Sequence, residues 1–192
     1  APYYFFVPKD YETEKKYNKG CSVNELFQIN SVGIVTAKDK ILIGNTSNEL
    51  AQQINEFYGD GSYKEKACQK ISYRPFDDRK IYFDADKIER SRKNVMQHFI
   101  RGKNLGLISA RSNKNPSMDH FFCTRNIMEA KCGESSTQSC IFPLYIYRED
   151  REKLLDKDSP DRKSNFNPEI IKKIEEILKL QLEKDFSPEN LF

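Results

Sequence analysis

The chain has 192 residues, of which 38% are hydrophobic and 12% aromatic, so it is long enough and apolar enough to form a folded core. Charged residues make up 32% of the chain, so its surface is heavily solvated, and the formal net charge of only +3 says little by itself about partners. No apolar run approaches the length of a membrane-spanning helix, so we expect no contact with a membrane.

Short segments rich in β-branched and aromatic residues predict strands. In chain order they are residues 3–7, 32–36, 41–43, 71–76, 80–83, 105–109, 121–124 and 141–147. A polar turn around Asp39 separates the second segment from the third, so we expect these two to pair as a β-hairpin. Pro75 marks a bend or a sheet edge after the fourth segment.

Apolar residues at helical spacing predict three helices among these strands. The first begins with a capping-box pattern at Thr46–Glu49 and stops at Gly59. The second covers residues 88–100, and its expected buried face carries Val95, Met96, Phe99 and Ile100. The third follows Asn167, with Pro168 at its first position and an apolar stripe of Ile171, Ile174, Leu178 and Leu182.

This order of elements predicts an α+β fold, with a mixed or antiparallel sheet, flanking helices and a C-terminal helical segment. Composition changes at Arg148, where a charged stretch with few apolar residues begins. We therefore expect one domain over residues 1–147, and a linker with a helical segment over 148–192. The chain begins with Ala1, and Ser187-Pro188 starts a helix just before its end, so we expect a piece of a longer polypeptide.

Positive charge is concentrated in one stretch, Lys87–Lys114, which holds eight basic residues and a single acid, Glu89. Cations gathered on one element without competing carboxylates are typical of a surface that binds a phosphate backbone. The expected phosphate contacts are Lys87, Arg90, Arg92, Lys93, Arg101 and Lys103. The alternative is a solvated helix face with no ligand.

A polar loop after the strand at 105–109 carries side chains suited to base edges, since arginine pairs with guanine and asparagine with adenine. The expected base contacts in and beyond this loop are Arg111, Asn113, Lys114, Asn115 and Arg125. This interpretation requires the cations of the Lys87–Lys114 stretch to share one exposed face.

Motifs for catalysis are absent from the sequence: there is no glycine-rich cofactor turn, phosphate loop or recognisable Ser or Cys nucleophile motif. Two acid pairs, Asp77/Asp78 and Asp84/Asp86, could in principle hold a metal, but capping of a helix from Lys87 and pairing with a nearby arginine explain them better. We expect no catalytic residue and no metal site. A small independent metal-dependent nuclease is the remaining enzyme alternative.

The two histidines and five cysteines also have structural explanations. His98 and His120 each stand alone beside apolar residues, so both are expected in the core or at a strand edge. The cysteines are odd in number and include no Cys-x-x-Cys pair, which argues against a disulfide framework or a zinc site. We expect reduced thiols and a cytoplasmic protein.

The segment Tyr73–Phe83 resembles the Tyr-Arg-Pro-Phe-Asp-x-Arg-x-Ile-Tyr-Tyr pattern of the C-terminal specificity domain in Type ISP restriction–modification enzymes and related adenine-specific DNA methyltransferases. The order of the flanking elements is also similar over nearly the whole chain, and Phe83 departs from the pattern where the family usually has tyrosine. The expected scaffold motif within this segment is Tyr73, Arg74, Pro75, Phe76, Asp77 and Arg79. In this interpretation Phe76 and Tyr82 anchor the turn and Asp77 pairs with Arg74 or Arg79; the alternative is that one of these arginines touches a phosphate.

The resemblance implies sequence-specific recognition of double-stranded DNA on behalf of a larger bacterial enzyme. It also implies a methyltransferase domain that uses S-adenosylmethionine in the same polypeptide, with nuclease and helicase domains as further possibilities, and no cofactor in this part. The main alternative is a non-catalytic interaction module whose basic helix docks on an acidic protein surface.

Overall fold

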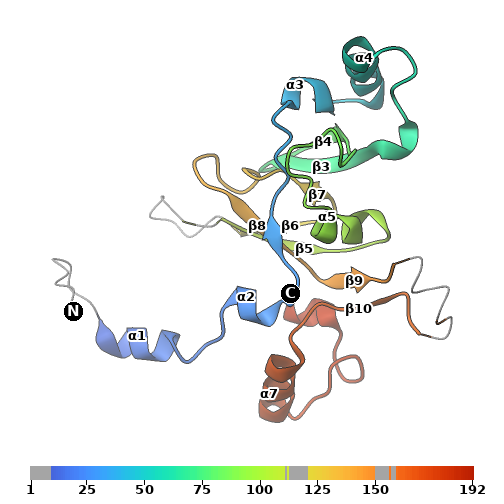
Figure 1. Ribbon diagram of the computed structural model, residues 1–192. Helices are drawn as coiled ribbons and strands as arrows, with labels where there is room; N and C mark the ends of the chain where they lie inside the picture. The colour runs from blue at the N-terminus through green and yellow to red at the C-terminus, as the bar shows by residue number, and fades with distance from the viewer. Residues whose placement is uncertain (1–9, 111, 113–120, 150–155, 157–158) are drawn as a thin grey trace.

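The computed structural model of the chain describes residues 10–110, 112, 121–149, 156 and 159–192 (Figure 1). Its helices are α1 (Tyr11–Tyr17), α2 (Val23–Leu26), α3 (Asp39–Leu42), α4 (Ser47–Tyr58), α5 (Lys93–Ile100) and α7 (Pro168–Leu178), with 3₁₀ turns η1 (Glu65–Ala67) and η2 (Pro188–Leu191). Its strands are β1 (Ser31–Val32), β2 (Ile43–Gly44), β3 (Cys68–Arg74), β4 (Asp77–Tyr82), β5 (Gly106–Ala110), β6 (Phe121–Thr124), β7 (Ile127–Met128), β8 (Ser139–Pro143), β9 (Tyr145–Tyr147) and β10 (Arg162–Ser164).

The strands form three sheets, which confirms the predicted α+β class. The first sheet has the order β2-β4-β3-β7 and is mixed, because β7 runs parallel to β3. The second has the order β1-β8-β5-β6 and is antiparallel. The third is the antiparallel pair β9 and β10. In Figure 1 helix α4 lies at one end of the molecule and α7 at the other, with the sheets between them.

The β3–β4 hairpin is the element that positions the candidate site. Arg74 pairs with Asp77, so only Pro75 and Phe76 connect the two strands. Proline cannot donate to a ladder and has a fixed φ, which suits the first position of a two-residue turn. The predicted bend at Pro75 is therefore confirmed. On the buried face of the hairpin, Ile71 and Ile81 are fully covered.

The main core joins the first two sheets to helices α4 and α5. Its buried side chains include Leu50 of α4, Met96 of α5, Ile71 of β3 and Ile108 of β5. Thr46 accepts a hydrogen bond from the Glu49 N–H at the start of α4, and Gly59 follows its last turn. The predicted first helix is thus confirmed.

A second cluster closes the other end of the molecule. Phe27, Phe142 and Phe166 are buried together, and the Phe27 ring lies 5.5 Å from that of Phe142 and 5.2 Å from that of Phe166. Asn167 accepts from the Glu169 N–H, so the predicted cap of the C-terminal helix is confirmed. This cluster contains residues from both sides of position 147, and the predicted division there stays a prediction.

The predicted hairpin around Asp39 is wrong. Residues 39–42 form helix α3, β1 pairs with β8, and β2 pairs with β4. The cause is polar: the Asp39 carboxylate accepts hydrogen bonds from the Thr36 hydroxyl and from Tyr73 Oη, so it faces inward instead of forming a turn tip.

The predicted helix over 88–100 is only partly correct. Residues before Lys93 are not helical, because Arg90 exchanges two backbone hydrogen bonds with Val35, of 3.0 and 3.1 Å. Arg92 then has a φ of 51° before α5 begins. Val95, Met96 and Phe99 are buried as expected, whereas Ile100 is 38% exposed.

Three smaller differences complete the comparison. The segment 141–147 is divided into β8 and β9 at Leu144. Helix α7 ends at Leu178, where Lys179 has a φ of 57°, and Leu178 is half-exposed. The strand predicted at 3–7 and His120 lie outside the described residues.

Within the described ranges, no helix has the length and apolar character needed to cross a lipid bilayer.

Candidate nucleic-acid interface

A groove of about 530 Å³ runs between the β3–β4 hairpin and strand β6. Ser72 of β3 and Thr124 of β6 form its floor, with their hydroxyl oxygens 2.8 Å apart. Asn126 donates to the Ser72 hydroxyl at 3.3 Å. Arg125 also lines the groove and its residue is exposed to solvent. The groove therefore offers two hydroxyls on its floor, and an amide and a guanidinium beside them.

The opposite wall carries Lys70 and Asp78, which form an ion pair of 3.0 Å. Burial opposes ionisation of Asp78, but hydrogen bonds from Lys70 and Ser72 prevail and hold the pKa of its carboxyl below the ordinary value. Lys70 is more than half exposed despite this pair. The lining thus contains three cations, Lys70, Arg74 and Arg125, against one carboxylate.

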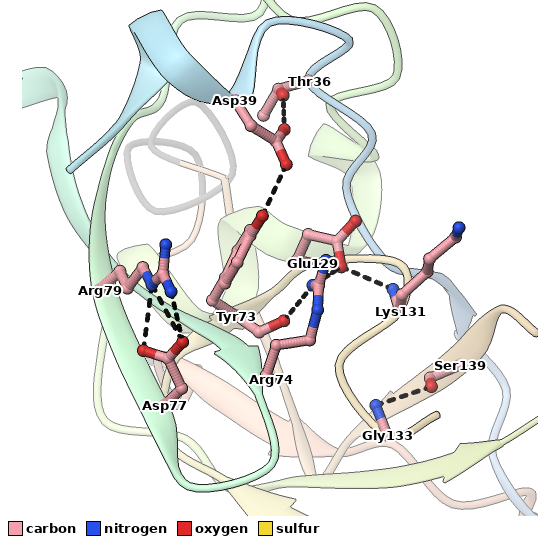
Figure 2. A network of polar contacts seen from close by, with 10 residues as sticks. All are labelled: Thr36, Asp39, Tyr73, Arg74, Asp77, Arg79, Glu129, Lys131, Gly133 and Ser139. Carbon is pink, nitrogen blue, oxygen red and sulfur yellow. Dashed lines mark hydrogen bonds and ion pairs between the residues drawn. The ribbon is translucent and has the colours of Figure 1, made fainter. Parts of the chain in front are cut away.

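Tyr73 braces the root of the hairpin turn. Figure 2 shows its ring between the guanidinium groups of Arg74 and Arg79, whose central carbons lie 4.0 and 4.2 Å from the ring centre. Such stacking of guanidinium on an aromatic face is attractive. Arg79 also makes a bidentate contact with Asp77, with Nε 3.1 Å from one carboxylate oxygen and Nη2 2.8 Å from the other. The predicted pairing of Asp77 inside its own turn is confirmed, with Arg79 as the partner.

Arg74 binds a residue that lies far away in the sequence, Glu129. Its guanidinium forms an ion pair with the Glu129 carboxylate, which also accepts a 2.7 Å hydrogen bond from the Lys131 N–H (Figure 2). Burial raises the pKa of the Glu129 carboxyl, while these two contacts act in the opposite direction. The hairpin is thereby fastened to the segment after β7.

The expected anchoring role of Phe76 is wrong. Its side chain is 99% exposed, and the only ring near it among the described aromatics is that of Phe122, at 5.9 Å and edge-on. Its φ is +60°, a value that side-chain-bearing residues rarely adopt. Tyr82, by contrast, is buried as expected. The scaffold motif therefore holds Tyr73, Arg74, Asp77 and Arg79 in place while it presents Phe76 to solvent.

Four of the five predicted base contacts, Arg111, Asn113, Lys114 and Asn115, lie outside the described residues. They belong to the connection between β5 and β6, the strands that border the groove. Arg125 is the one predicted base contact that the structure describes, and it lies at the groove itself.

Of the predicted phosphate contacts, two lie near an acid of the protein and a third has a buried side-chain nitrogen. Lys87 Nζ lies 2.7 Å from a carboxylate oxygen of Asp84, and this pairing raises the pKa of Lys87. Arg90 Nε lies 3.7 Å from Glu89. Arg92 has its Nε buried without a hydrogen-bond partner in the described part of the chain.

The other three flank α5, with Lys93 at its first residue and Arg101 and Lys103 after its last. Lys93 and Arg101 line a second groove of about 520 Å³, together with Lys64 and Lys66. Arg101 also reaches the Arg148 carbonyl, at 3.4 Å, and Glu149, at 3.8 Å. Lys103 is exposed, and its carbonyl accepts from Tyr147 Oη and Arg162. The structure thus brings Lys93 and Arg101 together, and the assignment of all six residues to phosphates stays a prediction.

Three of the four paired acids, Asp77, Asp78 and Asp84, and the described histidine, His98, have structural partners. Asp84 does not cap a helix from Lys87, because α5 begins six residues later; its carboxylate instead accepts from the Asp86 N–H at 3.1 Å in a turn. His98 is buried, and its Nδ1 accepts a 3.1 Å hydrogen bond from the Tyr147 N–H, which confirms the core interpretation. Among the described residues, no three His, Cys, Asp or Glu side chains cluster as a metal site would require.

Residues 59–192, more than half of the chain, match the Type ISP C-terminal specificity domain. This chain belongs to that family. The match confirms the resemblance carried by the Tyr73–Phe83 segment and covers both grooves. A search of curated proteins found none that matches the sequence of this chain.

Solved structures with the same fold include three large DNA complexes. A cryoEM structure of a DrdV–DNA complex aligns with a TM-score of 0.67 and 18% identity, and the alignment covers 87% of this chain and 19% of that one. The ATP-dependent Type ISP restriction–modification enzyme LlaBIII bound to DNA aligns at 0.59 and 15%, over 88% and 13%. A nuclease-deletion mutant of the Type ISP enzyme LlaGI with a DNA substrate mimic aligns at 0.55 and 13%, over 77% and 17%. The specificity domain thus spans less than a fifth of the length of these proteins.

Some residues in the specificity domain's grooves, and Glu129 behind one of them, escape sequence reasoning. Glu129 is an acid inside the apolar run Ile127–Ala130, and that misplaced charge is the one signal that could have indicated a buried partner. Asn126, Lys64 and Lys66 carry no local signal. They join their grooves only through the pairing of β7 with β3 and the packing of the hairpin end against α5.

Proposed function

We propose that this specificity domain reads a double-stranded DNA target for a bacterial Type ISP restriction–modification polypeptide. The observation that carries the proposal is the groove beside β6, where Arg125 and Asn126 lie side by side in the lining. Arginine and asparagine are the side chains that read guanine and adenine by paired hydrogen bonds. The DNA in the three related structures supports the same ligand for this fold.

The proposed phosphate contacts are the basic side chains that are exposed to solvent and lie away from the protein's own carboxylates. Lys93 and Lys103 are exposed, with Lys64 and Lys66 as additional candidates in the second groove. Lys87, Arg90 and Arg101 contribute less, because each lies near a carboxylate of the protein. Arg111, Asn113, Lys114, Asn115 and Arg125 remain the proposed base contacts.

The chemistry would belong to other domains of the same polypeptide. A methyltransferase domain would hold S-adenosylmethionine and methylate an adenine extruded from the duplex. This assignment rests on the family to which the chain belongs, and the present sequence itself contains no glycine-rich cofactor turn. Nuclease and helicase domains would accompany it where the parent enzyme also cuts DNA.

The first experiment measures binding of short duplexes to the chain at several salt concentrations. Binding should weaken steeply with salt, because bound cations release counterions from the phosphates. Lys93→Ala should weaken all duplexes alike and reduce the salt slope by about one, whereas Arg125→Ala should relax sequence preference, by roughly tenfold at one base pair. Lys172→Ala, an exposed cation on α7, is the matched control. A salt-independent response would contradict the proposal.

A protein contact is favoured at a different place, the end of α7. Ile177 is 79% exposed, and Leu178 and Leu180 are also largely uncovered. Exposed apolar residues that neighbour one another suit docking against another part of the parent polypeptide. Size-exclusion chromatography of the chain with and without DNA separates this role from DNA binding, since DNA binding shifts the elution only when a duplex is present, whereas a protein contact through α7 does not require one.

A further inference from the structure

We propose that Phe76 is a wedge that enters the base stack of the bound duplex. The inference rests on the proposed function, because it needs duplex DNA over the groove. Phe76 is the most exposed large hydrophobic residue in the described part of the chain, at 99%. A ring so placed has almost no contact to gain within the protein.

The backbone holds this ring out at a cost. Phe76 occupies the second position of a two-residue turn with a φ of +60°, where glycine or asparagine fits with less strain. Folding stability alone would therefore favour a smaller residue at this position. The arrangement is easier to explain if the ring meets a ligand.

Side-chain contacts brace the turn beneath the ring. The Tyr73 ring is clamped between Arg74 and Arg79, Asp77 holds Arg79, and Tyr73 Oη donates to Asp39 at 2.9 Å (Figure 2). Ordering a side chain on binding costs conformational entropy, and a braced turn reduces that cost. Phe76 is therefore presented in advance rather than ordered by its ligand.

The surroundings of the ring select a nucleic acid rather than an apolar partner. Phe76 lines the same groove as Lys70, Arg74 and Arg125. Lys70 pairs with Asp78, the one acid among the described lining residues, and Arg74 pairs with Glu129, which leaves Arg125 as the exposed cation without such a pair in the described part of the chain. Cations beside an exposed aromatic ring fit phosphates beside stacked bases. Phenylalanine is one of the residues that proteins insert between base steps, where partial unstacking is offset by new contacts.

The test uses the whole 192-residue chain and duplexes enriched on it from a random pool, each with 2-aminopurine at one scanned position. Fluorescence of 2-aminopurine rises when the base loses its stacking neighbours. The wild-type chain should raise it at one base step, and Phe76→Ala should abolish the rise and weaken binding about tenfold. Phe76→Leu, which keeps an apolar wedge, should retain part of the signal.

Two controls separate the outcomes. Phe57→Ala removes another exposed ring, on α4, and should change neither signal. The salt slope of Phe76→Ala should equal that of the wild type, because no cation is removed. Salt-dependent binding with unchanged fluorescence at every position, and wild-type affinity in Phe76→Ala, would overturn the wedge while the proposed function stands. Failure of the wild-type chain to bind any duplex would overturn both.

Discussion

Lys87 is a basic residue whose charge is already paired with an acid of the protein. Its Nζ lies 2.7 Å from Asp84, and both side chains are about one quarter exposed. The hydrogen bond from Lys87 lowers the pKa of the Asp84 carboxyl in the folded state. The stability from this group is therefore present above the ordinary carboxyl value of 3.8 and is lost as the pH falls through the lowered value.

Lys87→Gln should consequently raise the pKa of Asp84 towards its ordinary value, and this can be followed by NMR titration of the carboxyl carbon. The free energy of unfolding at neutral pH should fall by only about 0.5 kcal/mol, since the pair is partly solvated. DNA affinity should change less than in Lys93→Ala. A loss of affinity as large as that of Lys93→Ala would show that Lys87 leaves Asp84 to bind DNA.

His98 predicts a second pH dependence at the scale of one residue. Burial, aided by the positive charge of Arg101, lowers the pKa of His98 below its ordinary 6.5. Between the lowered value and 6.5 the unfolded chain binds more protons than the folded one, so stability should fall as the pH drops below about 6.5. Urea unfolding between about pH 7.5 and pH 5.5 should show this fall in the wild type and a smaller one in His98→Gln. Parallel pH curves for the two proteins would contradict the assignment.

At the scale of elements, local signals predict what local interactions determine. The capped helix α4 and the β3–β4 hairpin follow from Thr46, Gly59 and Pro75, whose preferences act within a few residues. The hairpin expected around Asp39 fails because the Asp39 carboxylate binds Tyr73, which is distant in sequence. Helix α5 is shorter than predicted for a similar reason, since Arg90 pairs with the backbone of Val35. Tertiary contacts override local preference in both cases.

The β3–β4 turn predicts a stability effect that is separate from binding. Glycine tolerates positive φ, and the exposed Phe76 ring contributes little packing, so Phe76→Gly should unfold with a free energy about 1 kcal/mol above that of Phe76→Ala. Alanine keeps the strained conformation and therefore serves as the matched reference. Chemical denaturation of the two variants measures the difference. Equal stability would mean that the turn relaxes once the ring is removed.

At the scale of the whole molecule, the sequence predicts that there is a DNA-binding surface better than it predicts which residues form that surface. The family pattern at Tyr73–Phe83 indicates a turn at the right place, but it cannot show that Phe76 points outward while Tyr82 is buried. The charge count of Lys87–Lys114 treats all cations alike, whereas the fold pairs Lys87 with Asp84 and adds Lys64 and Lys66 from another element. Pairing and assembly depend on three-dimensional neighbours, which no linear count contains.

Asn165, a fully buried residue in the segment that follows β10, connects distant parts of the chain. Its side-chain amide donates to the Ile29 and Pro143 carbonyls, each at 2.7 Å, and its oxygen accepts from the Ile29 N–H at 2.9 Å. Three parts of the chain thus meet at one side chain, across the division predicted at residue 147.

Asn165→Ala leaves these three backbone groups without their partner and should lower the free energy of unfolding by about 2 to 4 kcal/mol. Because β8 contributes Phe142 to the second cluster and Ile141 to the main core, we expect the loss to appear in one cooperative transition. Urea unfolding followed by both tyrosine fluorescence and circular dichroism should give coincident curves shifted to lower urea. Asn167→Ala, which removes only the exposed helix cap, is the control and should cost about 1 kcal/mol. Two separated transitions in Asn165→Ala would instead mean that residues 148–192 fold as an independent unit.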